Sequence, residues 1–594
     1  MQEKAGNFDE GIHLVEYEEP FRAKLIEDSS INQSGRQTES LNGSWHYAID
    51  QYDTCLRTKW FEERYESEQG LPYPVDFSFD NWETMQVPSC WNVQSELLHL
   101  YEGPMVFTRR FVYQNHGEDR VFIKIGAANY QATVFVNKQY MGMHLGGSTP
   151  FCVEVTDVLE KDNRILVVVN NTRRRTNLPC ENTDWFNYGG IHRDVTLLRL
   201  PKTFIEDFKV HLVPDDSFNK ISAAITLNGS IKDGLAKLSI PDLKIAADIQ
   251  VKNGKGSITL DASPQLWSPQ TPHLYEVKVT FGEDSITEQI GFRQIRAVGD
   301  NIYLNGKEIH LCGVSAHEES VENGRAVTDE EIRKMFAQAK AMNCNFMRLA
   351  HYPHTERAAQ IADEMGLLLW EEIPVYWAIA FANPDTYRDA ENQLTELINR
   401  DYNRASVIFW SVGNENADTD DRLEFMSRLI EKTKEIDSTR LVSAACLVDH
   451  QTHIITDRLA AHVDVIGINE YYGWYNPDFK QLLTLFEINK PGKPVIISEF
   501  GADAPAGMRG SKDELFTEDH QLYVYQRQID AFLQAPNYLV GTTPWIFFDF
   551  RCPRRTHFMQ GYYNRKGLLS ADLNYRKLAF YAMKDYYAMK ISQG

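Results

Sequence analysis

Two glutamates stand where strand-like runs end, and their residue type and placement suit acid–base and nucleophilic chemistry. Glu415 follows the apolar run 407–412, and Glu499 follows the apolar run 494–497. A carboxylate directly after a buried strand is costly unless it is used or paired. Cleavage of a glycosidic bond needs such a pair, since one carboxyl group protonates the leaving oxygen while the other stabilises the oxocarbenium-like centre. The alternative is that each glutamate ends a strand and pairs with an arginine, an explanation that weakens when two such glutamates occur together.

Pairing these glutamates requires a scaffold that brings separate strand ends together. After Gly291, strand-like runs alternate with amphipathic helices, which is the signature of βα units and a parallel sheet. The clearest helix begins after a Thr328 cap, has Glu331 three residues later and carries apolar residues at helical spacing. The pattern predicts a (β/α)8 barrel with Glu415 after the fourth strand and Glu499 after the seventh, at the end where barrels gather their chemistry. The predicted strands are 309–311, 345–348, 367–370, 407–412, 441–444, 465–468, 495–498 and 541–547.

The first half of the chain is predicted to be β structure. Short β-branched runs at 121–125, 132–136 and 165–169 are separated by Gly, Asn and Asp clusters. The alternation continues from Phe204 to about residue 288, a length suited to one immunoglobulin-like sandwich. At 594 residues the chain is too long for a single core. We therefore expect two β-sandwiches followed by the barrel.

Composition and charge exclude several classes of function. Hydrophobic residues make up 43% and charged residues 24%, as in a folded globular protein, and the net charge of −22 opposes nucleic-acid binding. The same charge repels an anionic substrate at long range, so a pocket for one needs its own positive groups. No run approaches the ~18 apolar residues of a membrane span, and the first residues lack the features of a signal peptide. We expect no membrane association and a cytoplasmic protein, or a periplasmic one if an export signal was removed.

Several short motifs lie in a consistent order along the chain. Asn414-Glu415 and Ser498-Glu499-Phe-Gly resemble the acid/base and nucleophile motifs of glycoside hydrolase family 2. The resemblance covers nearly the whole chain. Val87-Pro-Ser-Cys-Trp-Asn and Tyr188-Gly-Gly-Ile-His-Arg resemble the family's sugar-binding domain, Leu266-Trp-Ser-Pro its sandwich, and Leu304-Asn-Gly-Lys with Arg348-Leu-Ala-His-Tyr-Pro its barrel.

The resemblance implies a multidomain architecture: an N-terminal sugar-binding jelly-roll β-sandwich over 1–202, an immunoglobulin-like β-sandwich over 203–296 and a C-terminal catalytic TIM barrel over 297–594. It also implies a retaining double displacement, in which Glu499 is the nucleophile and Glu415 is the general acid and then the base, with the carboxyl groups about 5–5.5 Å apart. Asn414 would hydrogen-bond the sugar 2-hydroxyl, and His351 would orient a sugar hydroxyl or the nucleophile. No cofactor is required, and no metal site is expected because the histidines lack metal-ligand spacing.

A segment near the C-terminus indicates which sugar is bound. Asn564-Arg-Lys566 matches the Asn-x-Lys motif that grips the C6 carboxylate in the β-glucuronidases of the family, and a lysine with an asparagine amide suits a carboxylate. The alternative is a solvated loop of ordinary turn residues. The resemblance also assigns substrate contacts to Asp184, Tyr471, Tyr475 and Trp545, although buried aromatic residues more often belong to a core.

Three positions depart from the glucuronidase pattern and keep other substrates open. Leu349-Ala350 replaces a usual Thr-Ser, Gln560 stands where an arginine often precedes the Asn-x-Lys motif, and Glu470 stands where an arginine is common. Arg551, Arg554 and Arg555 are either a replacement for the missing arginine or a solvated charge cluster.

We expect a β-glucuronidase that acts on a carbohydrate substrate as a homo-oligomer. The alternatives are a β-galactosidase or β-galacturonidase of the same family, or a non-catalytic carbohydrate-binding protein. The short loop 318–327 favours an open mouth of the barrel.

Overall fold

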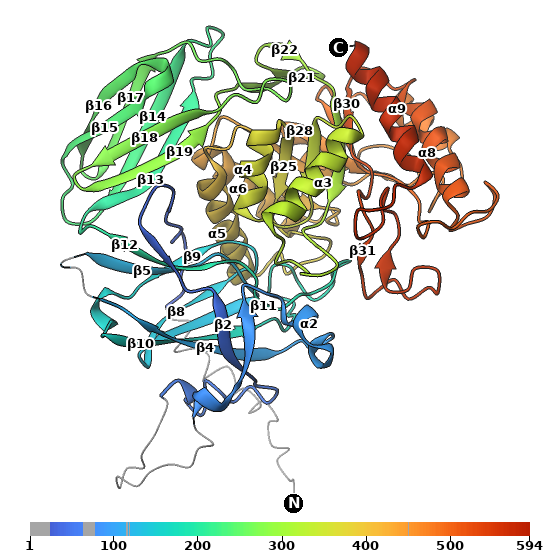
Figure 1. Ribbon diagram of the computed structural model, residues 1–594. Coiled ribbons are helices and arrows are strands. Elements are labelled where there is room, and N and C mark those ends of the chain that lie inside the picture. The colour runs from blue at the N-terminus through green and yellow to red at the C-terminus, as the bar shows by residue number, and fades with distance from the viewer. Residues whose placement is uncertain (1–23, 63–77, 115–116, 118, 450, 594) are drawn as a thin grey trace, which may run out of the picture. The chain divides into compact units, whose positions relative to one another are not determined.

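The computed structural model describes residues 24–62, 78–114, 117, 119–449 and 451–593 (Figure 1). The chain divides into two compact units, Met1–Thr172 with Asn187–Lys202, and Arg173–Phe186 with Thr203–Gly594. Residues 1–23 of the predicted first domain, from which the expected location was argued, lie outside the described part.

The first unit contains two antiparallel sheets that enclose a core. Trp45, Phe107, Ile123 and Leu197 come from both sheets and belong to one buried cluster, so the apolar faces of the two sheets pack on each other. The predicted N-terminal β-sandwich is therefore confirmed. The larger sheet has the order β3 (Glu83–Val87), β2 (Gly43–Ile49), β4 (Pro104–Val112), β10 (Asp162–Asn170), β7 (Gln131–Val136) and β8 (Gln139–Leu145). The smaller sheet has the order β1 (Thr38–Ser40), β12 (Val195–Leu200), β5 (Arg120–Ile125) and β9 (Phe151–Glu154), and the pair β6 (Ala128–Asn129) with β11 (Gly190–Ile191) and the short helix α2 (Trp91–Gln94) complete the unit.

The second unit begins with a sandwich of antiparallel strands. Buried and partly exposed residues alternate along Lys220–Asn228, so one face of that strand points into the core. The first strand also contacts the last two strands, which folds the sheet back on itself, and the predicted immunoglobulin-like sandwich is confirmed. The strand order is β13 (Phe204–Leu212), β14 (Lys220–Asn228), β17 (Lys255–Asp261), β16 (Ile245–Lys252), β15 (Gly234–Ile240), β18 (Tyr275–Phe281) and β19 (Asp284–Ile290).

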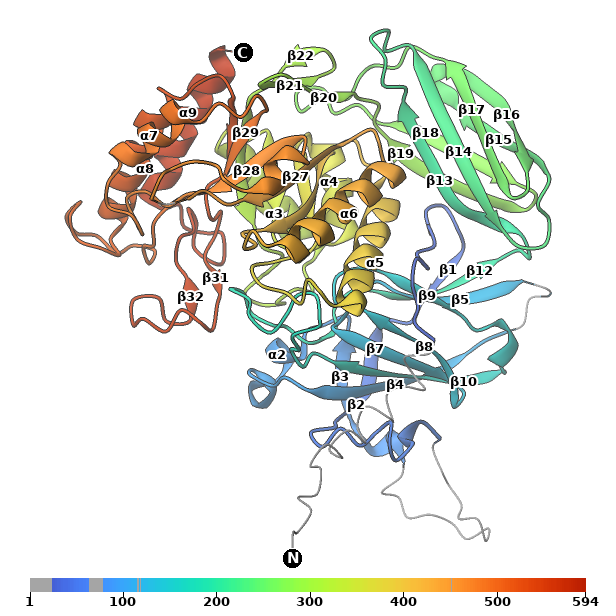
Figure 2. The same ribbon diagram turned by 180° about the vertical axis from the view of Figure 1, so that it is seen from behind.

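Eight parallel strands then close into a barrel, and their order around the ring is their order in the sequence. Helices surround the strands, as the views from the front and from behind both show (Figures 1 and 2). The barrel strands are β23 (Leu311–Ala316), β24 (Phe346–Leu349), β25 (Leu368–Glu372), β26 (Val407–Asn414), β27 (Leu441–Cys446), β28 (Val465–Asn469), β29 (Val495–Glu499) and β30 (Leu539–Thr542). The helices are α3 (Asp329–Ala341), α4 (Glu356–Met365), α5 (Pro384–Asp401), α6 (Asp420–Ile436), α7 (Lys480–Ile488), α8 (Glu518–Phe532) and α9 (Leu578–Gln593).

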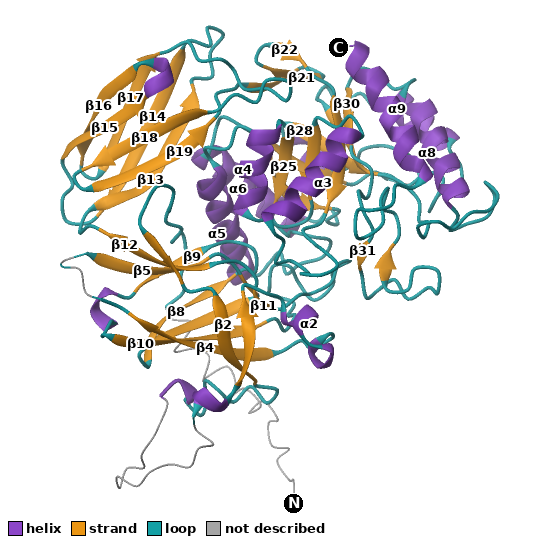
Figure 3. Cartoon of the chain, in the orientation of Figure 1, coloured by secondary structure: helices purple, strands orange, loops and turns teal. Residues whose placement is uncertain are grey.

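Short strands precede and follow the barrel. The strands β20 (Ile295–Val298), β21 (Asn301–Leu304) and β22 (Lys307–Glu308) form a small antiparallel sheet, and β31 (Phe550–Arg551) pairs with β32 (Tyr563–Asn564) near the C-terminus. Figure 3 shows the sandwich, which is mostly strands, apart from the barrel, in which strands and helices alternate.

The predicted barrel is confirmed, with two strand positions corrected. The first strand lies at Leu311–Ala316 rather than at 309–311, because the small residues Gly313 and Ser315 conceal it from a search for large apolar runs. The last strand ends at Thr542, although an apolar and aromatic run continues to Phe550, because Pro544 cannot donate to a strand ladder. The predicted helix cap is confirmed: Thr328 N donates to Glu331 Oε2 over 2.8 Å, and Glu331 N donates to Thr328 Oγ1 over 3.3 Å.

Two further properties bear on the sequence-based expectations. All eight cysteines are buried and unbridged. In the part of the chain that the structure describes, no helix has the length and apolarity needed to cross a membrane.

Candidate active site

A cavity of about 480 Å³ opens at the carboxyl ends of the barrel strands. Both glutamates line it, together with aromatic residues from several loops and the guanidinium of Arg555. The lining residues are Asp184, Tyr376, Trp377, Glu415, Asn469, Glu470, Tyr471, Tyr472, Tyr475, Asn476, Pro477, Glu499, Trp545 and Arg555. Of the residues predicted for the site, the structure thus brings Asp184, Glu415, Tyr471, Tyr475, Glu499 and Trp545 to one cavity.

Glu499 is the last residue of β29 and is 5% exposed. Its carboxylate is held at both oxygens: Arg348 NH1 donates to Oε1 over 2.9 Å, and the hydroxyl of Tyr471 donates to Oε2 over 2.7 Å. Burial, supported by repulsion from the Glu415 carboxylate, raises the pKa of Glu499 to about 8 against the opposing influence of Arg348. The two carboxyl groups therefore interact electrostatically.

Glu415 directly follows β26 and is half-buried at the cavity wall. Asn469 Nδ2 donates to its Oε1 over 3.0 Å, and the indole Nε1 of Trp377 donates to its Oε2 over 2.8 Å. The backbone of Glu415 has a φ of 52°, a left-handed conformation that costs a non-glycine residue about 1–2 kcal/mol. Such strain is retained mainly at functional sites, where it aims a side chain.

A buried ion-pair network joins the strand ends behind the glutamates. Arg348 is fully buried, and its NH2 donates to Glu372 Oε1 over 3.0 Å and to Asn414 Oδ1 over 2.8 Å. Burial disfavours charge on Glu372, but Arg348 and His351 outweigh it and lower the pKa of Glu372 to about 2. The network therefore holds one permanent cation directly against Glu499.

His351 lies beside this network. Its Nδ1 lies 2.8 Å from Glu372 Oε1, its Nε2 lies 3.8 Å from Glu499 Oε1, and its ring stacks on Trp545. Burial, reinforced by Arg348, lowers the pKa of His351. Arg348 and His351 thus keep their contacts although Leu349 and Ala350 replace the usual pair between them.

Asn414 is fixed through its oxygen and open at its nitrogen. Its Oδ1 accepts from Arg348 and, over 3.1 Å, from Asn469 Nδ2. Its Nδ2 is buried and has no hydrogen-bond partner among the described residues. A buried donor without an acceptor is unfavourable, so this amide is prepared for an acceptor from outside the protein.

Lys566 and Asn564 lie behind the cavity rather than on its lining. The Lys566 ammonium donates to Asp503 Oδ2 over 2.5 Å and to the Tyr475 hydroxyl over 3.1 Å, and the rings of Tyr471, Trp474 and Tyr475 surround it at 5.1–5.8 Å. Burial opposes the charge, but Asp503 outweighs it and raises the pKa of Lys566. Asn564 is buried, and its Nδ2 has no partner in the described part of the chain.

Arg555 lines the cavity, whereas Gln560, five residues later in the same loop, does not. Its guanidinium pairs with Asp184, and its NH1 donates to the Tyr475 hydroxyl over 3.2 Å. Gln560 instead turns to Asp503, to which its amide donates over 3.1 Å. Arg555 and Gln560 thus contact different carboxylates.

Several residues of the site, Arg348 among them, were not among the predicted site residues. Glu372 and Asn469 each end a barrel strand, so their position at a strand end was the available signal. Trp377 and Asp503 lie in loops after β25 and β29, and nothing in the sequence marked them beyond that placement. Across the described residues, no group of three or more His, Cys, Asp or Glu side chains has an arrangement that could hold a metal ion.

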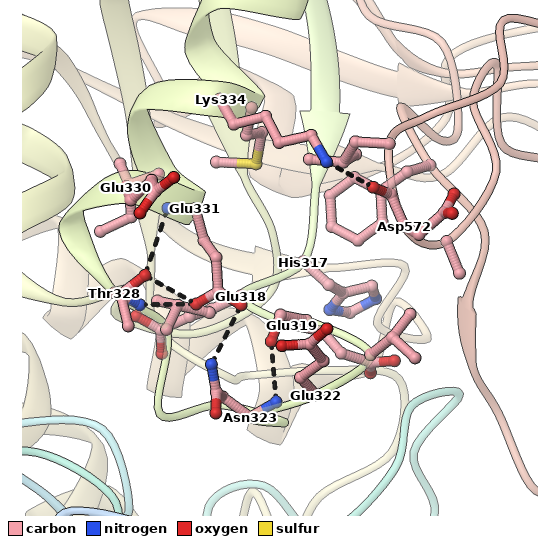
Figure 4. A pocket seen from close by; sticks show the side chains of 18 of the residues that line it. His317, Glu318, Glu319, Glu322, Asn323, Thr328, Glu330, Glu331, Lys334 and Asp572 are labelled. Carbon is pink, nitrogen blue, oxygen red and sulfur yellow. Dashed lines mark hydrogen bonds between the residues drawn. The ribbon is translucent and has the colours of Figure 1, made fainter.

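A second cavity, of about 440 Å³, lies beside the first, between the loop after β23 and the helix α3 (Figure 4). Its lining contains Glu318, Glu319, Glu322, Glu330, Glu331 and Asp572. None of the residues predicted for the site line it.

Comparisons with known proteins agree with this architecture. Three sequence models match the chain: "Glycosyl hydrolases family 2, sugar binding domain" over residues 38–201, "Glycosyl hydrolases family 2" over 203–293 and "Glycosyl hydrolases family 2, TIM barrel domain" over 295–591. A β-glucuronidase of Paenibacillus borealis is 28% identical over 90% of this chain and 94% of its own. A β-glucuronidase structure from an uncultured Clostridium sp. is 26% identical and covers 94% of this chain and 99% of its own, with a TM-score of 0.82. A β-galacturonidase structure from Eisenbergiella tayi, 24% identical over 95% of this chain and 99% of its own, shares the fold with a TM-score of 0.81.

Proposed function

Because this chain belongs to glycosyl hydrolase family 2, we propose that it is a retaining β-glucuronidase, an enzyme that removes terminal β-D-glucuronic acid from glucuronides. The observation that carries the proposal is a set of buried N–H groups that lack an acceptor among the described residues: Asn414 Nδ2, Asn564 Nδ2 and Arg555 Nε. Asn414 directly precedes Glu415, and Arg555 lines the same cavity as both glutamates. Open buried donors call for an oxygen-rich ligand, and a sugar that carries a carboxylate is such a ligand.

In the first step Glu499 attacks the anomeric carbon while Glu415 protonates the glycosidic oxygen. The hydrogen bonds from Arg348 and Tyr471 to Glu499 stabilise the carboxylate that must be ionised for the attack. Trp377 and Asn469 fix both oxygens of Glu415, so its carboxyl group is oriented before the substrate arrives. The bond to the aglycone breaks, and a glycosyl-enzyme ester forms at Glu499.

In the second step Glu415 takes a proton from water, and the water attacks the anomeric carbon to release the sugar. Glu499 leaves as a carboxylate next to Arg348, which stabilises the negative charge. Asn414 Nδ2 donates to the sugar 2-hydroxyl, a contact that strengthens in the oxocarbenium-like transition state. Two inversions at the anomeric carbon give net retention.

The protonation of Glu499 sets the lower end of the working pH range. Burial raises the pKa of Glu499 to about 8. A protonated carboxyl group is a poor nucleophile, so the fraction of enzyme that is ready for attack grows as the pH rises towards that value.

The C6 carboxylate is assigned to a group of three donors. Lys566 supplies a buried ammonium, Asn564 an open amide, and Arg555 a guanidinium on the cavity wall. These cations offset the overall charge of −22 at the point where an anionic sugar binds. Asp184 orients Arg555 through their ion pair, and Tyr475 touches both cations. Tyr471, Tyr475 and Trp545 offer surface for the sugar ring.

The remaining expectations form part of the same proposal. We assign residues 1–202, 203–296 and 297–594 to the sugar-binding, immunoglobulin-like and catalytic domains. Within this division, residues 173–186 pack with the barrel, and they carry Asp184 to the cavity. We further propose a homo-oligomer that works in the cytoplasm, or in the periplasm if the natural chain carries an export signal.

The direct test compares the rates of hydrolysis of p-nitrophenyl β-glucuronide, β-galacturonide and β-galactoside by the purified protein. We expect a clear preference for the glucuronide, and proton NMR of the first-formed sugar should show the β-anomer. A preference for the galacturonide or the galactoside would assign the chain to that activity instead. No hydrolysis of any of the three would favour a carbohydrate-binding protein.

A further inference from the structure

Three arginines lie at the end of β31 and in the loop that follows it, and they differ in what they contact. Arg551 donates to the Val321 carbonyl and the Tyr563 hydroxyl. Arg555 is committed to Asp184 and Tyr475. Arg554 is exposed, and no carboxylate pairs with it in the described part of the chain. Its guanidinium instead lies over Trp377, a residue that lines the active-site cavity.

The position of Arg554 relates it to the acid/base residue. Its guanidinium carbon lies 4.8 Å from the centre of the Trp377 ring, and Trp377 Nε1 donates to Glu415 Oε2 over 2.8 Å. Only the indole thus separates Arg554 from Glu415. Because Glu415 protonates the oxygen that links sugar and aglycone, Arg554 lies on the side from which the aglycone leaves.

Trp377, on whose ring Arg554 stacks, is held in place by hydrogen bonds to its backbone. Trp377 N donates to the Asn414 carbonyl over 3.0 Å, and Asn416 Nδ2 donates to the Trp377 carbonyl over 2.8 Å. Trp377 also lines the cavity. Stacking on this ring orients the guanidinium while its N–H groups stay open to a ligand.

We propose that Arg554 and Trp377 form an aglycone subsite that selects aglycones bearing an anionic group, a sulfate or a carboxylate, near the glycosidic bond. This inference rests on the proposed function, since it assumes that Glu415 faces the aglycone. The indole contacts the ring of the aglycone, and the guanidinium donates to the anion in a charge-assisted hydrogen bond. The subsite is separate from the donors assigned to the C6 carboxylate, so one substrate can present an anion to each.

The test uses the ratio of kcat/KM for two matched substrates, 4-carboxyphenyl and 4-methylphenyl β-glucuronide, in the wild-type protein and in Arg554→Gln. Each ratio is compared between proteins, so the different reactivity of the two leaving groups cancels. We expect the ratio of anionic to neutral substrate to fall about fivefold in Arg554→Gln, the effect of losing one partly exposed ionic contact. Salt should lower the ratio in the wild-type protein and have less effect in the variant.

A matched control is Arg428→Gln, which removes an exposed guanidinium that lies 3.6 Å from the centre of the Tyr387 ring on the outer helices of the barrel. This variant should keep the wild-type ratio.

A second comparison distinguishes an anion on a small aryl group from an anion on a sugar. A glucuronate-terminated disaccharide is compared with its sulfated form, and sulfation should raise kcat/KM only when Arg554 is present. An unchanged ratio in Arg554→Gln, or an equal loss on both aryl substrates, would overturn the inference. If the wild-type protein cleaves no glucuronide, the proposed function fails and the inference with it.

Discussion

The two cavities at the carboxyl ends of the barrel strands have similar volumes, about 480 and 440 Å³, but their acids are used differently. In the acidic cavity of Figure 4, Glu331 completes the cap of α3, Glu318 accepts from Thr355 N, and Glu319 accepts from Arg551 N over 2.9 Å. These carboxylates hold loops and helix ends in place. In the active-site cavity the carboxylates of Glu415 and Glu499 repel each other, and the side-chain amides of Asn414 and Asn564 each have a donor without an acceptor among the described residues.

Neither the volume of a cavity nor its number of acids therefore marks a site. What distinguishes the active-site cavity is the combination of two interacting carboxyl groups with several buried polar groups that lack a partner among the described residues, because keeping such groups costs stability. The acidic cavity has one such atom in its lining, His317 Nε2, and its carboxylates Glu318, Glu319 and Glu331 stabilise local structure.

The largest effect is expected for Glu499→Gln. The amide cannot form the glycosyl ester, so kcat on every glycoside substrate should fall by roughly 10⁴-fold or more. Steady-state rates on p-nitrophenyl β-glucuronide measure this. Azide added to Glu499→Gln should not restore formation of a product with retained anomeric configuration. A rate in this variant close to that of the wild-type protein would show that Glu499 is not the nucleophile.

The second effect concerns the buried cation behind the cavity. Removing Lys566 alone leaves Asp503 as a buried charge, so the informative variant is Lys566→Met with Asp503→Asn. We expect kcat/KM for the glucuronide to fall roughly 10²-fold, while a neutral β-glycoside loses much less. A thermal melt checks that the variant is folded. An equal loss on charged and neutral substrates would remove Lys566 from carboxylate binding.

The third effect is on stability. Glu470 lies on the wall of the active-site cavity, its Oε1 lacks a partner among the described residues, and burial raises its pKa to about 8. The folded state therefore binds a proton that the unfolded state has released above pH about 4.5, so this residue makes folding less favourable as pH rises from there to 8. Glu470→Gln lacks this penalty, and it should be more stable than wild type by roughly 2 kcal/mol at pH 9, with little difference at pH 4.

Urea unfolding at both pH values measures the difference between the two proteins. Tyr472 N still has an oxygen to donate to in the variant, because glutamine keeps a carbonyl at that position. If the difference in free energy of unfolding between the two proteins does not change with pH, Glu470 does not remain protonated in the folded protein.

The fourth effect is the acidic limb of the pH profile. Since Glu499 must be ionised for the attack and burial raises its pKa to about 8, kcat/KM should rise about tenfold per pH unit up to that value. Rates between pH 5 and 10 on a glucuronide show this limb. Its persistence at the same pH in Glu470→Gln would assign it to Glu499 rather than to Glu470.

The smallest effect is expected in the acidic cavity. Glu322→Gln and Glu330→Gln change exposed carboxylates there, and each should alter the free energy of unfolding by no more than about 0.5 kcal/mol, with the glucuronide rate kept. A loss of activity in either variant would break the contrast between the cavities and give the acidic one a role in catalysis.

The strands, the helices and the two glutamates at strand ends could be predicted from the sequence, because each depends on neighbouring residues. The change from period-two strands to alternating strands and helices predicts the sandwiches and the barrel, and the cap at Thr328 predicts the start of α3. An apolar run that ends in a carboxylate can be recognised from a few neighbouring residues, so Glu415 and Glu499 were found together with their strands. The first barrel strand was misplaced because its small residues resemble a turn.

Which side chains meet across the barrel could be seen only in the folded chain. Asp184 and Arg555 are 371 positions apart, and no periodicity could show that Arg555, rather than a residue at position 560, reaches the aspartate. Trp377 and Asp503 were missed for the same reason, since they act through Glu415 and Lys566 and not through a motif of their own. Local hydrogen bonds and apolar spacing are set by neighbouring residues, whereas contacts between loops depend on how the whole barrel closes.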